Sequence, residues 1–257
     1  MELNKIHNED CLLTMQKMDK KSIDLVLTSP PYNTSRSGSK TDPYSFRYDN
    51  YKDSMTNDDY ISFICDVFNG YDAVLKCNGV VLFNISYSSE NTSLIWDVIS
   101  NIQKNTEFVV ADCIVWKKQN AIPNNVSPNK TTRICEFVFV FCRKNEFSTF
   151  FMNKGIDSVS KKGQNIYKNV FNFIEAPNND CSTHINKATF STIFVRKLLL
   201  LYAKKGSIIY DSFMGTVTTA VGAVKEGMYY IGSELSKEQC EYAENRIQKE
   251  TQQLTLF

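Results

Sequence analysis

The first residues with chemical potential are Ser29-Pro30-Pro31-Tyr32, which follow a short apolar run of the chain. Consecutive prolines hold the backbone extended and lack N–H groups, so the Pro30 carbonyl is expected to be a rigidly aimed acceptor. The Ser29 hydroxyl is an acceptor beside it, and Tyr32 adds a flat ring. Two acceptors and a ring suit the amino group of a flat heterocycle. A proline turn that only ends a strand would have the same sequence, so these residues alone leave both readings open.

A second candidate site lies in residues 208–219, IIYDSFMGTVTT. This segment predicts a strand, a tight loop and the start of a helix, whose first N–H groups lack partners. Gly215 would let a ligand approach the backbone closely. Glu234 follows a second strand about 20 residues further on, where a carboxylate can accept hydrogen bonds from both ribose hydroxyls. The loop lacks the G-x-G-x-x-G pattern of pyrophosphate sites, which favours a nucleoside cofactor without phosphates.

The charge of the chain is unevenly distributed, although its formal total is only +1. Residues 1–115 carry a net charge of −6 and residues 116–170 a net charge of +7. The remaining segments are close to neutral, with +1 over 171–199 and −1 over 200–257. The basic segment is either a solvated face or a surface for a polyanion, because phosphates dominate affinity for nucleic acids.

Several classes of protein are excluded by composition. No apolar run reaches the roughly 18 residues of a membrane helix, and residues 1–5 give no sign of a signal peptide. The chain has only two histidines, so a metal site built on several of them is excluded, and we expect no metal. The eight cysteines form no C-x-x-C pair, and several lie in apolar strand-like runs. We therefore expect reduced thiols and a cytoplasmic location.

Strands that alternate with helices predict an α/β fold with a doubly wound, mostly parallel sheet. Residues 33–58 are polar and suggest a loop, and residues 144–182 lack a long periodic run. We expect strands at 23–28, 80–85, 108–117, 134–143, 207–211 and 228–232, and helices at 12–18, 59–76, 92–103, 189–203, 218–225 and 237–249.

Together the two candidate sites resemble those of the DNA amino-methyltransferases, which use S-adenosylmethionine to methylate cytosine N4 or adenine N6. Residues 29–32 match their catalytic motif (D/N/S)-P-P-(Y/F), and residues 211–219 resemble their cofactor loop D-P-F-x-G-S-G-T-T. The catalytic motif precedes the cofactor loop, which is the order of the β class. Further similar segments are 8–11 with 23–26, 116–117, 136–144, 184–200, 231–236 and 242–246.

The cofactor loop departs from the family pattern at three positions. Ser212 replaces a proline, Thr216 a serine and Val217 the second glycine. A β-branched residue is not expected to adopt a glycine-only conformation, so Val217 predicts weaker cofactor binding or a shifted loop. Residues 184–187, HINK, also differ from the usual H-P start of their segment.

The resemblance implies a mechanism in which the target base is flipped out of the duplex. Ser29 and the Pro30 carbonyl would accept the two amino hydrogens and localise the lone pair on nitrogen, while Tyr32 would stack on the base. Positioning would supply much of the acceleration. The catalytic residues are thus Ser29, Pro30, Pro31 and Tyr32.

The same resemblance implies the cofactor site. Asp10 would contact the adenine amino group and Glu234 the ribose, while Phe213 and Phe190 would flank the adenine or the methionine part. Asp211 and the loop backbone would take the methionine end. The full set of expected cofactor-binding residues is Asp10, Cys11, Phe190, Asp211, Phe213, Gly215, Thr216, Glu234 and Ser236.

DNA contacts are expected from two segments outside the matched motifs. Residues 33–58 would close over the flipped base, and about 145–182 would form a target-recognition insert between a catalytic half, 1–144, and a cofactor half, 183–257, of one Rossmann-like domain. The residues expected to bind DNA are Arg36, Lys40, Arg47, Lys154, Lys161, Lys162 and Lys168.

The substrate is left open in several respects. Serine at position 29, within L-T-S-P-P-Y, is more typical of cytosine N4 enzymes, with adenine N6 as the alternative. Methylation of protein or RNA is a more distant alternative, since the motif order there is usually reversed, and a catalytically inactive DNA-binding relic is another. Double-stranded DNA is the expected partner, with a restriction endonuclease and a homodimer as further candidates and no membrane.

Overall fold

The computed structural model describes residues 1–33, 55–87, 91–178 and 191–254. Four of the predicted site residues therefore lie outside the described part of the chain. They are Arg36, Lys40, Arg47 and Phe190.

Within these described ranges, the core of the fold is an eight-stranded sheet with the order β1-β10-β9-β2-β3-β5-β4-β8. Every neighbouring pair is parallel except those of β5, which runs antiparallel to both β3 and β4. The strands are β1 (Lys5–His7), β2 (Ile23–Thr28), β3 (Leu75–Ile85), β4 (Phe108–Lys118), β5 (Cys135–Arg143), β8 (Phe173–Ala176), β9 (Ile208–Asp211) and β10 (Tyr229–Ser233).

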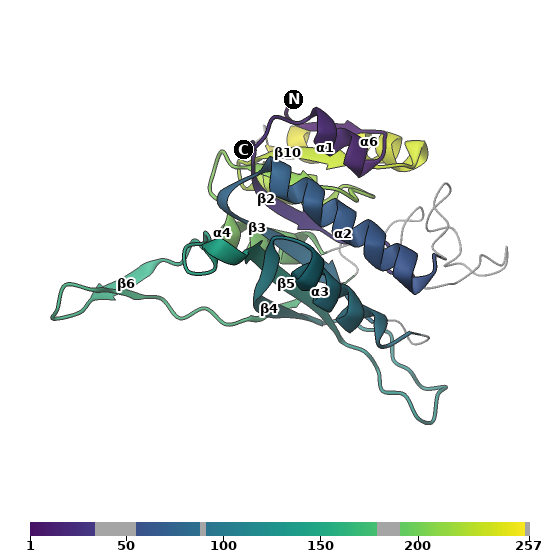
Figure 1. The fold of residues 1–257 in the computed structure, drawn as a ribbon, viewed down its shortest axis with the longest axis horizontal. Helices are drawn as coiled ribbons and strands as arrows, with labels where there is room; N and C mark the ends of the chain where they lie inside the picture. Colours follow the sequence, from purple (N-terminus) through teal and green to yellow (C-terminus); the bar gives the residue numbers. More distant parts are fainter. Residues whose placement is uncertain (34–54, 88–90, 179–190, 255–257) are drawn as a thin grey trace.

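Helices cover both faces of this sheet (Figure 1). One face carries α1 (Cys11–Lys17), α2 (Asn57–Val74) and α3 (Leu94–Asn105). The other carries α4 (Thr192–Tyr202), α5 (Thr218–Lys225) and α6 (Lys237–Leu254). The predicted doubly wound α/β fold is thus confirmed.

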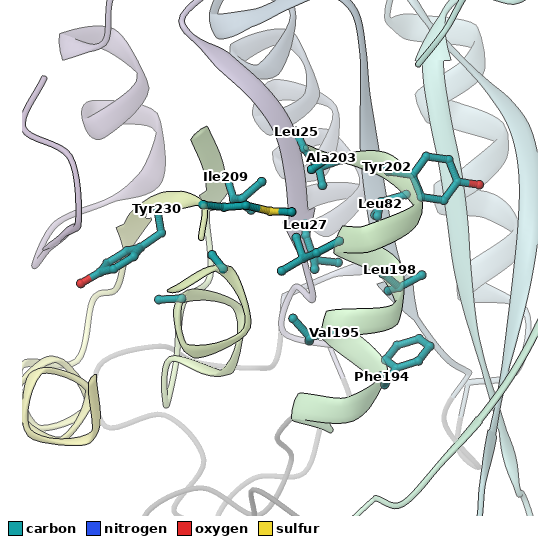
Figure 2. Close-up of a cluster of buried hydrophobic side chains, with 14 of the residues drawn as sticks. Leu25, Leu27, Leu82, Phe194, Val195, Leu198, Tyr202, Ala203, Ile209 and Tyr230 are labelled. Carbon is teal, nitrogen blue, oxygen red and sulfur yellow. The ribbon is translucent and has the colours of Figure 1, made fainter. Parts of the chain in front are cut away.

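The side chains of the central strand β2 explain why helices have to cover both faces of the sheet. Leu25 and Leu27 contribute to the core on the α4–α5 side, which Figure 2 shows, whereas Ile23 and Val26 pack on the side of α1 and α2. All four side chains are fully buried. A strand that is apolar on both faces has to lie inside a three-layer structure.

The strand order places a topological switch point between β2 and β9. The chain passes from β2 through α2 to β3 on one side, and from β9 through α5 to β10 on the other. The connections diverge there, which leaves room beyond the carboxyl ends of these two strands, and open α/β sheets bind their ligands at such a point.

Most predicted elements are present within a few residues, but β1, β8, the start of β3 and two short strands, Ile156–Val159 and Asn165–Tyr167, were missed. With three residues, β1 is too short to show a period. The helix predicted to run to Lys76 and stop near Asn78-Gly79 ends at Val74, and β3 begins at once. A side chain at Gly79 would come within 2.9 Å of the Asp24 carbonyl, so glycine serves strand packing there.

Residues 145–178 divide into two parts. A hairpin of β6 (Ile156–Val159) and β7 (Asn165–Tyr167) projects from the body, and we call residues 154–168 the arm (Figure 1). The strand β8 instead joins the main sheet beside β4. No helix among the described residues is long and apolar enough to cross a membrane.

Candidate active site

The predicted catalytic and cofactor motifs meet at one edge of the sheet. Parallel pairing aligns the carboxyl ends of β1, β10, β9 and β2, so the loops that follow these four strands lie next to one another. Ser29 directly follows β2, Glu234 follows β10, and Asp211 ends β9. Segments 183 residues apart in sequence, those of Thr28 and Asp211, are thus brought together.

Asp211 joins the catalytic strand to the cofactor loop. One of its carboxylate oxygens accepts hydrogen bonds from the Thr28 hydroxyl at 2.7 Å and from the Phe213 amide at 3.1 Å. The other accepts from the Thr219 hydroxyl at 2.6 Å. The side chain is buried, and burial raises the pKa of Asp211 to about 6, although its three donors oppose the shift. A buried carboxylate needs such donors to avoid a large desolvation cost.

The position where the family pattern has proline extends the same network. Ser212 is hydrogen-bonded to the Tyr71 hydroxyl of α2 and lies 3.2 Å from the Thr28 hydroxyl. A proline could not form either contact. Serine therefore ties the loop to α2 as well as to β2, which gives this departure a structural role.

The proline pair is anchored from α2. The Tyr60 hydroxyl donates to the Pro31 carbonyl at 2.7 Å, and all of Pro30, Pro31 and Tyr60 are buried. No described residue donates to the Pro30 carbonyl. The Pro31 carbonyl thus anchors the motif to α2, whereas the Pro30 carbonyl, the predicted acceptor for a substrate, takes no part in this anchoring.

Tyr32 lies in a polar network that the sequence did not reveal. Its hydroxyl accepts a hydrogen bond from Ser29 Oγ at 3.2 Å. It also lies 3.1 Å from Asn84 Oδ1 and 3.4 Å from Glu136 Oε2, both of which are acceptors. Glu136 in turn forms an ion pair with Lys118. Since Tyr32 uses an acceptor lone pair for Ser29, the lone pairs of Ser29 stay available for a donor on the substrate.

Asn84 is held in a fixed orientation within this network. Its Nδ2 donates to the Phe137 carbonyl at 3.0 Å, so its Oδ1 must face Tyr32. The side chain comes from β3, while Glu136 and Phe137 come from the neighbouring antiparallel strand β5. Neither Asn84 nor Glu136 has a local sequence signal, because only the register of β3 against β5 brings them to Tyr32.

Glu234 bridges the loops after β9 and β10. Its oxygens accept from the Gly215 amide at 2.8 Å and from the Ser236 amide at 2.9 Å. Burial raises the pKa of Glu234, and the two backbone donors counteract the rise. The side chain of Asn8 donates to the Glu234 carbonyl at 2.9 Å and so fixes this turn from β1.

Asp10 and Cys11 lie at the start of α1 on the same edge. Asp10 caps the helix by accepting from the Leu12 amide at 2.7 Å, and it stays partly exposed. Cys11 is buried, which raises the pKa of its thiol to about 12 and keeps it protonated. Phe213, also partly exposed, packs edge-on against Phe63 with ring centroids 6.0 Å apart.

Val217 does adopt the left-handed conformation, with φ of 73° and ψ of 23°, so the expectation that it could not is wrong. Its side chain is fully buried in the core under α4 and α5, and its amide donates to the Met214 carbonyl at 2.9 Å. Burial of an apolar side chain offsets the backbone strain, which for a non-glycine residue is of the order of 1–2 kcal/mol.

The other departure, Thr216, is also held in place. Its carbonyl accepts from Arg246 Nη1 of α6 at 2.8 Å.

The four predicted DNA-binding lysines within 145–182 are elsewhere, on the exposed arm. The residues that hold the motifs but were not predicted as site residues are Thr28, Tyr60, Tyr71, Asn84, Glu136, Thr219 and Arg246. Glu136, Thr219 and Arg246 lie within segments that match the family, but their contacts were not foreseen.

Known proteins are similar to this chain over most of its length. A family model described as DNA methylase, of the N6/N4 methyltransferase type, matches residues 23–245. The chain is 24% identical to the type II methyltransferase M.Cfr9I of Citrobacter freundii, over 97% of this chain and 90% of that protein. It is 26% identical to the orphan methyltransferase M.BamHII of Bacillus amyloliquefaciens, over 88% of this chain and 89% of that one.

Solved structures show the same fold. The PvuII DNA methyltransferase, described as cytosine-N4-specific, superposes with a TM-score of 0.73 at 15% identity, over 98% of this chain and 91% of that one. M1.HpyAVI in complex with S-adenosylmethionine gives 0.62 at 18% identity, over 95% and 98% of the two chains.

The buried Asp211 carboxylate predicts a pH-dependent stability. Its pKa is about 6 in the folded protein and about 4 in an unfolded chain, so its contribution is full below pH 4 and is lost as the pH rises through 6. Asp211→Asn does not titrate. From pH 4 to pH 7 the wild type should lose up to about 3 kcal/mol relative to this variant. Urea unfolding of both proteins across this range measures the difference, and a constant difference would contradict the prediction. Asp97→Asn, on the exposed side of α3, is the control.

The strained backbone at Val217 predicts that an alanine and a glycine variant have the reverse of their usual order of stability. Val217→Ala and Val217→Gly both remove buried apolar surface, but only glycine also relieves the positive φ. We expect the glycine variant to be the more stable one by about 1 kcal/mol, whereas alanine is favoured by about that amount in ordinary helices. Urea unfolding tests this, with Ala220→Gly inside α5 as the control that should show the ordinary order.

Proposed function

The chain belongs to the N6/N4 DNA methylase family, and from this premise we propose that it is a cytosine N4 methyltransferase acting on specific sites in double-stranded DNA. Members of this family are DNA amino-methyltransferases that use S-adenosylmethionine. The observation that carries the proposal is the contact between Thr28 and Asp211, at 2.7 Å, which sets the S-P-P-Y motif directly beside the cofactor loop.

The residues at the strand ends fit S-adenosylmethionine. Residues 211–219 carry no basic side chain that would match a phosphate, and the half-buried Glu234 carboxylate suits the hydroxyls of a ribose. Asp10 would hold the adenine amino group, Phe213 would cover the adenine or the methionine part, and Gly215 and Ser236 would belong to the same binding site. The bound cofactor supplies a methyl group that is attached to a sulfonium ion. When the methyl group is transferred, the electron pair of the broken carbon–sulfur bond stays on sulfur.

The four residues of the S-P-P-Y motif would hold the amino group for attack. An exocyclic amino nitrogen is a poor nucleophile because its lone pair is delocalised into the ring. Acceptance of its two hydrogens by Ser29 Oγ and the Pro30 carbonyl would localise that pair on nitrogen. The direction of the Tyr32–Ser29 hydrogen bond supports this role, since it uses the Ser29 proton and not its lone pairs. Tyr32 would stack on the flipped base.

Cytosine is proposed as the target base because serine precedes the proline pair. The similar PvuII enzyme is described as cytosine-N4-specific, which supports the same choice. Adenine N6 is the alternative, since the family includes both reactions. A partner restriction endonuclease and a homodimer stay predictions.

Contacts to DNA are proposed for the arm. Its lysines, Lys154, Lys161, Lys162 and Lys168, are exposed and belong to the basic segment of the chain. A projecting two-stranded hairpin can enter a groove of DNA, and phosphate contacts would position it without selecting a sequence.

The proposed chemistry is tested by methyl transfer to DNA. The wild type should move tritiated methyl groups from S-adenosylmethionine to genomic DNA, and nucleoside mass spectrometry should detect N4-methylcytosine. Tyr32→Ala and Pro31→Ala should each lower the rate by at least about 100-fold, because positioning of the amino group is lost. Tyr229→Ala, at an exposed tyrosine of β10, is the control. Full activity of both variants would contradict the assignment of the motif. Detection of N6-methyladenine in place of N4-methylcytosine would show that adenine is the target base.

The proposed DNA contact is tested by salt dependence. Each phosphate contact contributes about 0.9 to the slope of log affinity against log salt. Lys161→Ala with Lys162→Ala should therefore reduce the slope by about 2. The control pair is Lys20→Ala with Lys249→Ala, two exposed lysines outside the arm. An unchanged slope in the arm variant would exclude these lysines as phosphate contacts.

A further inference from the structure

The side chains of Ser29, Tyr32 and Glu136 form a continuous row of hydroxyl and carboxylate groups. Ser29 Oγ donates to the Tyr32 hydroxyl at 3.2 Å, and the single Tyr32 proton faces two acceptors, Asn84 Oδ1 at 3.1 Å and Glu136 Oε2 at 3.4 Å. Every hydrogen in this row points away from the side on which Ser29 would meet a substrate. The row therefore has the polarity of a path along which a proton can leave the substrate.

Amino methylation creates a proton that has to leave. The substrate nitrogen carries two hydrogens and the neutral methylated product carries one, so one N–H bond must break with its electron pair staying on nitrogen. In a closed site little water is present to take this proton. Ser29 and the Pro30 carbonyl are the two groups that would contact the amino hydrogens, and a carbonyl oxygen cannot pass a proton on.

We propose that Glu136 is the terminal acceptor of the proton released on methyl transfer, and that Tyr32 relays it. The amino proton moves to Ser29 Oγ as the Ser29 proton moves to the Tyr32 oxygen and the Tyr32 proton moves to Glu136. Ser29 and Tyr32 end neutral, the methylated base is neutral, and Glu136 holds the single proton. The inference rests on the proposed function, whose site it deepens.

The surroundings of Glu136 suit this role. It forms an ion pair with Lys118, and the two side chains are 15% and 21% exposed, so the pair is sheltered but reaches water. A proton accepted there can be lost to solvent before the next turnover. Asn84 also lies within hydrogen-bonding distance of Tyr32, at 3.1 Å, but an amide oxygen is far too weak a base to keep a proton. Asn84 is therefore a positioning residue for the Tyr32 hydroxyl.

A nearby glutamate offers a matched control. Glu175 of β8 pairs with Lys117 at 3.0 Å, one residue before Lys118 on β4, and it forms no described contact with Tyr32. Replacement of either glutamate by glutamine removes one carboxylate that is paired with a neighbouring lysine. Only Glu136→Gln should then affect the chemistry.

The experiment compares Glu136→Gln, Tyr32→Phe, their double variant and Glu175→Gln in single-turnover methylation, with enzyme in excess over DNA. Glutamine keeps an acceptor for Tyr32 but cannot take the proton, and phenylalanine keeps the ring but breaks the row. We expect each of the first two to lower the rate about 100-fold, within the range of general acid–base catalysis. The double variant should be no slower than either single variant, because both interrupt one path. Glu175→Gln should keep the wild-type rate.

A further readout separates proton acceptance from a structural role. The fluorescence of 2-aminopurine at the target position reports base flipping without turnover, and it should be the same in Glu136→Gln as in the wild type. Loss of that signal would indicate a structural defect and overturn the assignment.

The outcomes distinguish this inference from the proposed function. If the wild type methylates DNA but Glu136→Gln and Tyr32→Phe keep its rate, or if their losses add in the double variant, Glu136 is not the proton acceptor. If the wild type does not methylate DNA, the proposed function itself fails. Tyr32→Phe leaves the ion pair of Glu136 intact, so it tests the path even if Glu136→Gln does not fold.

Discussion

The buried Asp211 carboxylate is the constraint on which the site depends. It lies at the switch point between β9 and β2, where it accepts from Thr28, Thr219 and the Phe213 amide. Because an unpaired carboxylate would be costly there, each of these donors has to stay in place. Thr28 immediately precedes Ser29, and Phe213 lies in the cofactor loop. One buried group thus sets the distance between the S-P-P-Y motif, proposed to hold the base, and the loop proposed to bind the methyl donor.

The arrangement of polar groups around the S-P-P-Y motif follows a single logic. The Tyr60 hydroxyl donates to the Pro31 carbonyl, and the Tyr32 hydroxyl accepts a hydrogen bond from Ser29. The Pro30 carbonyl and the lone pairs of Ser29 remain as acceptors for the proposed substrate. A site made of acceptors suits an amino group, which has two hydrogens to donate. The departures in the cofactor loop fit the same frame, since Ser212 adds a hydroxyl contact that a proline would remove.

Local patterns predicted those elements whose burial is regular. The helix at 218–225 is present with the expected bounds, and the strand at 23–28 is too. Two strands that depend on distant partners were missed, since β1 pairs with β10 and β8 pairs with β4, and so was the short local hairpin of β6 and β7. The conformation of Val217 was misjudged, because the burial that offsets its strain comes from packing under α4 and α5.

By itself the sequence determined the family, the cofactor class and the motifs, since these depend on residue types at fixed spacing within short segments. The tertiary structure alone decided which groups hold those motifs in place. Thr28 meets Asp211, and Glu136 meets Tyr32, across separations of 183 and 104 residues. Such contacts arise from strand order and register, which no local pattern encodes. The direction of the Ser29 hydrogen bond, and with it the path proposed for the proton, follows from that register.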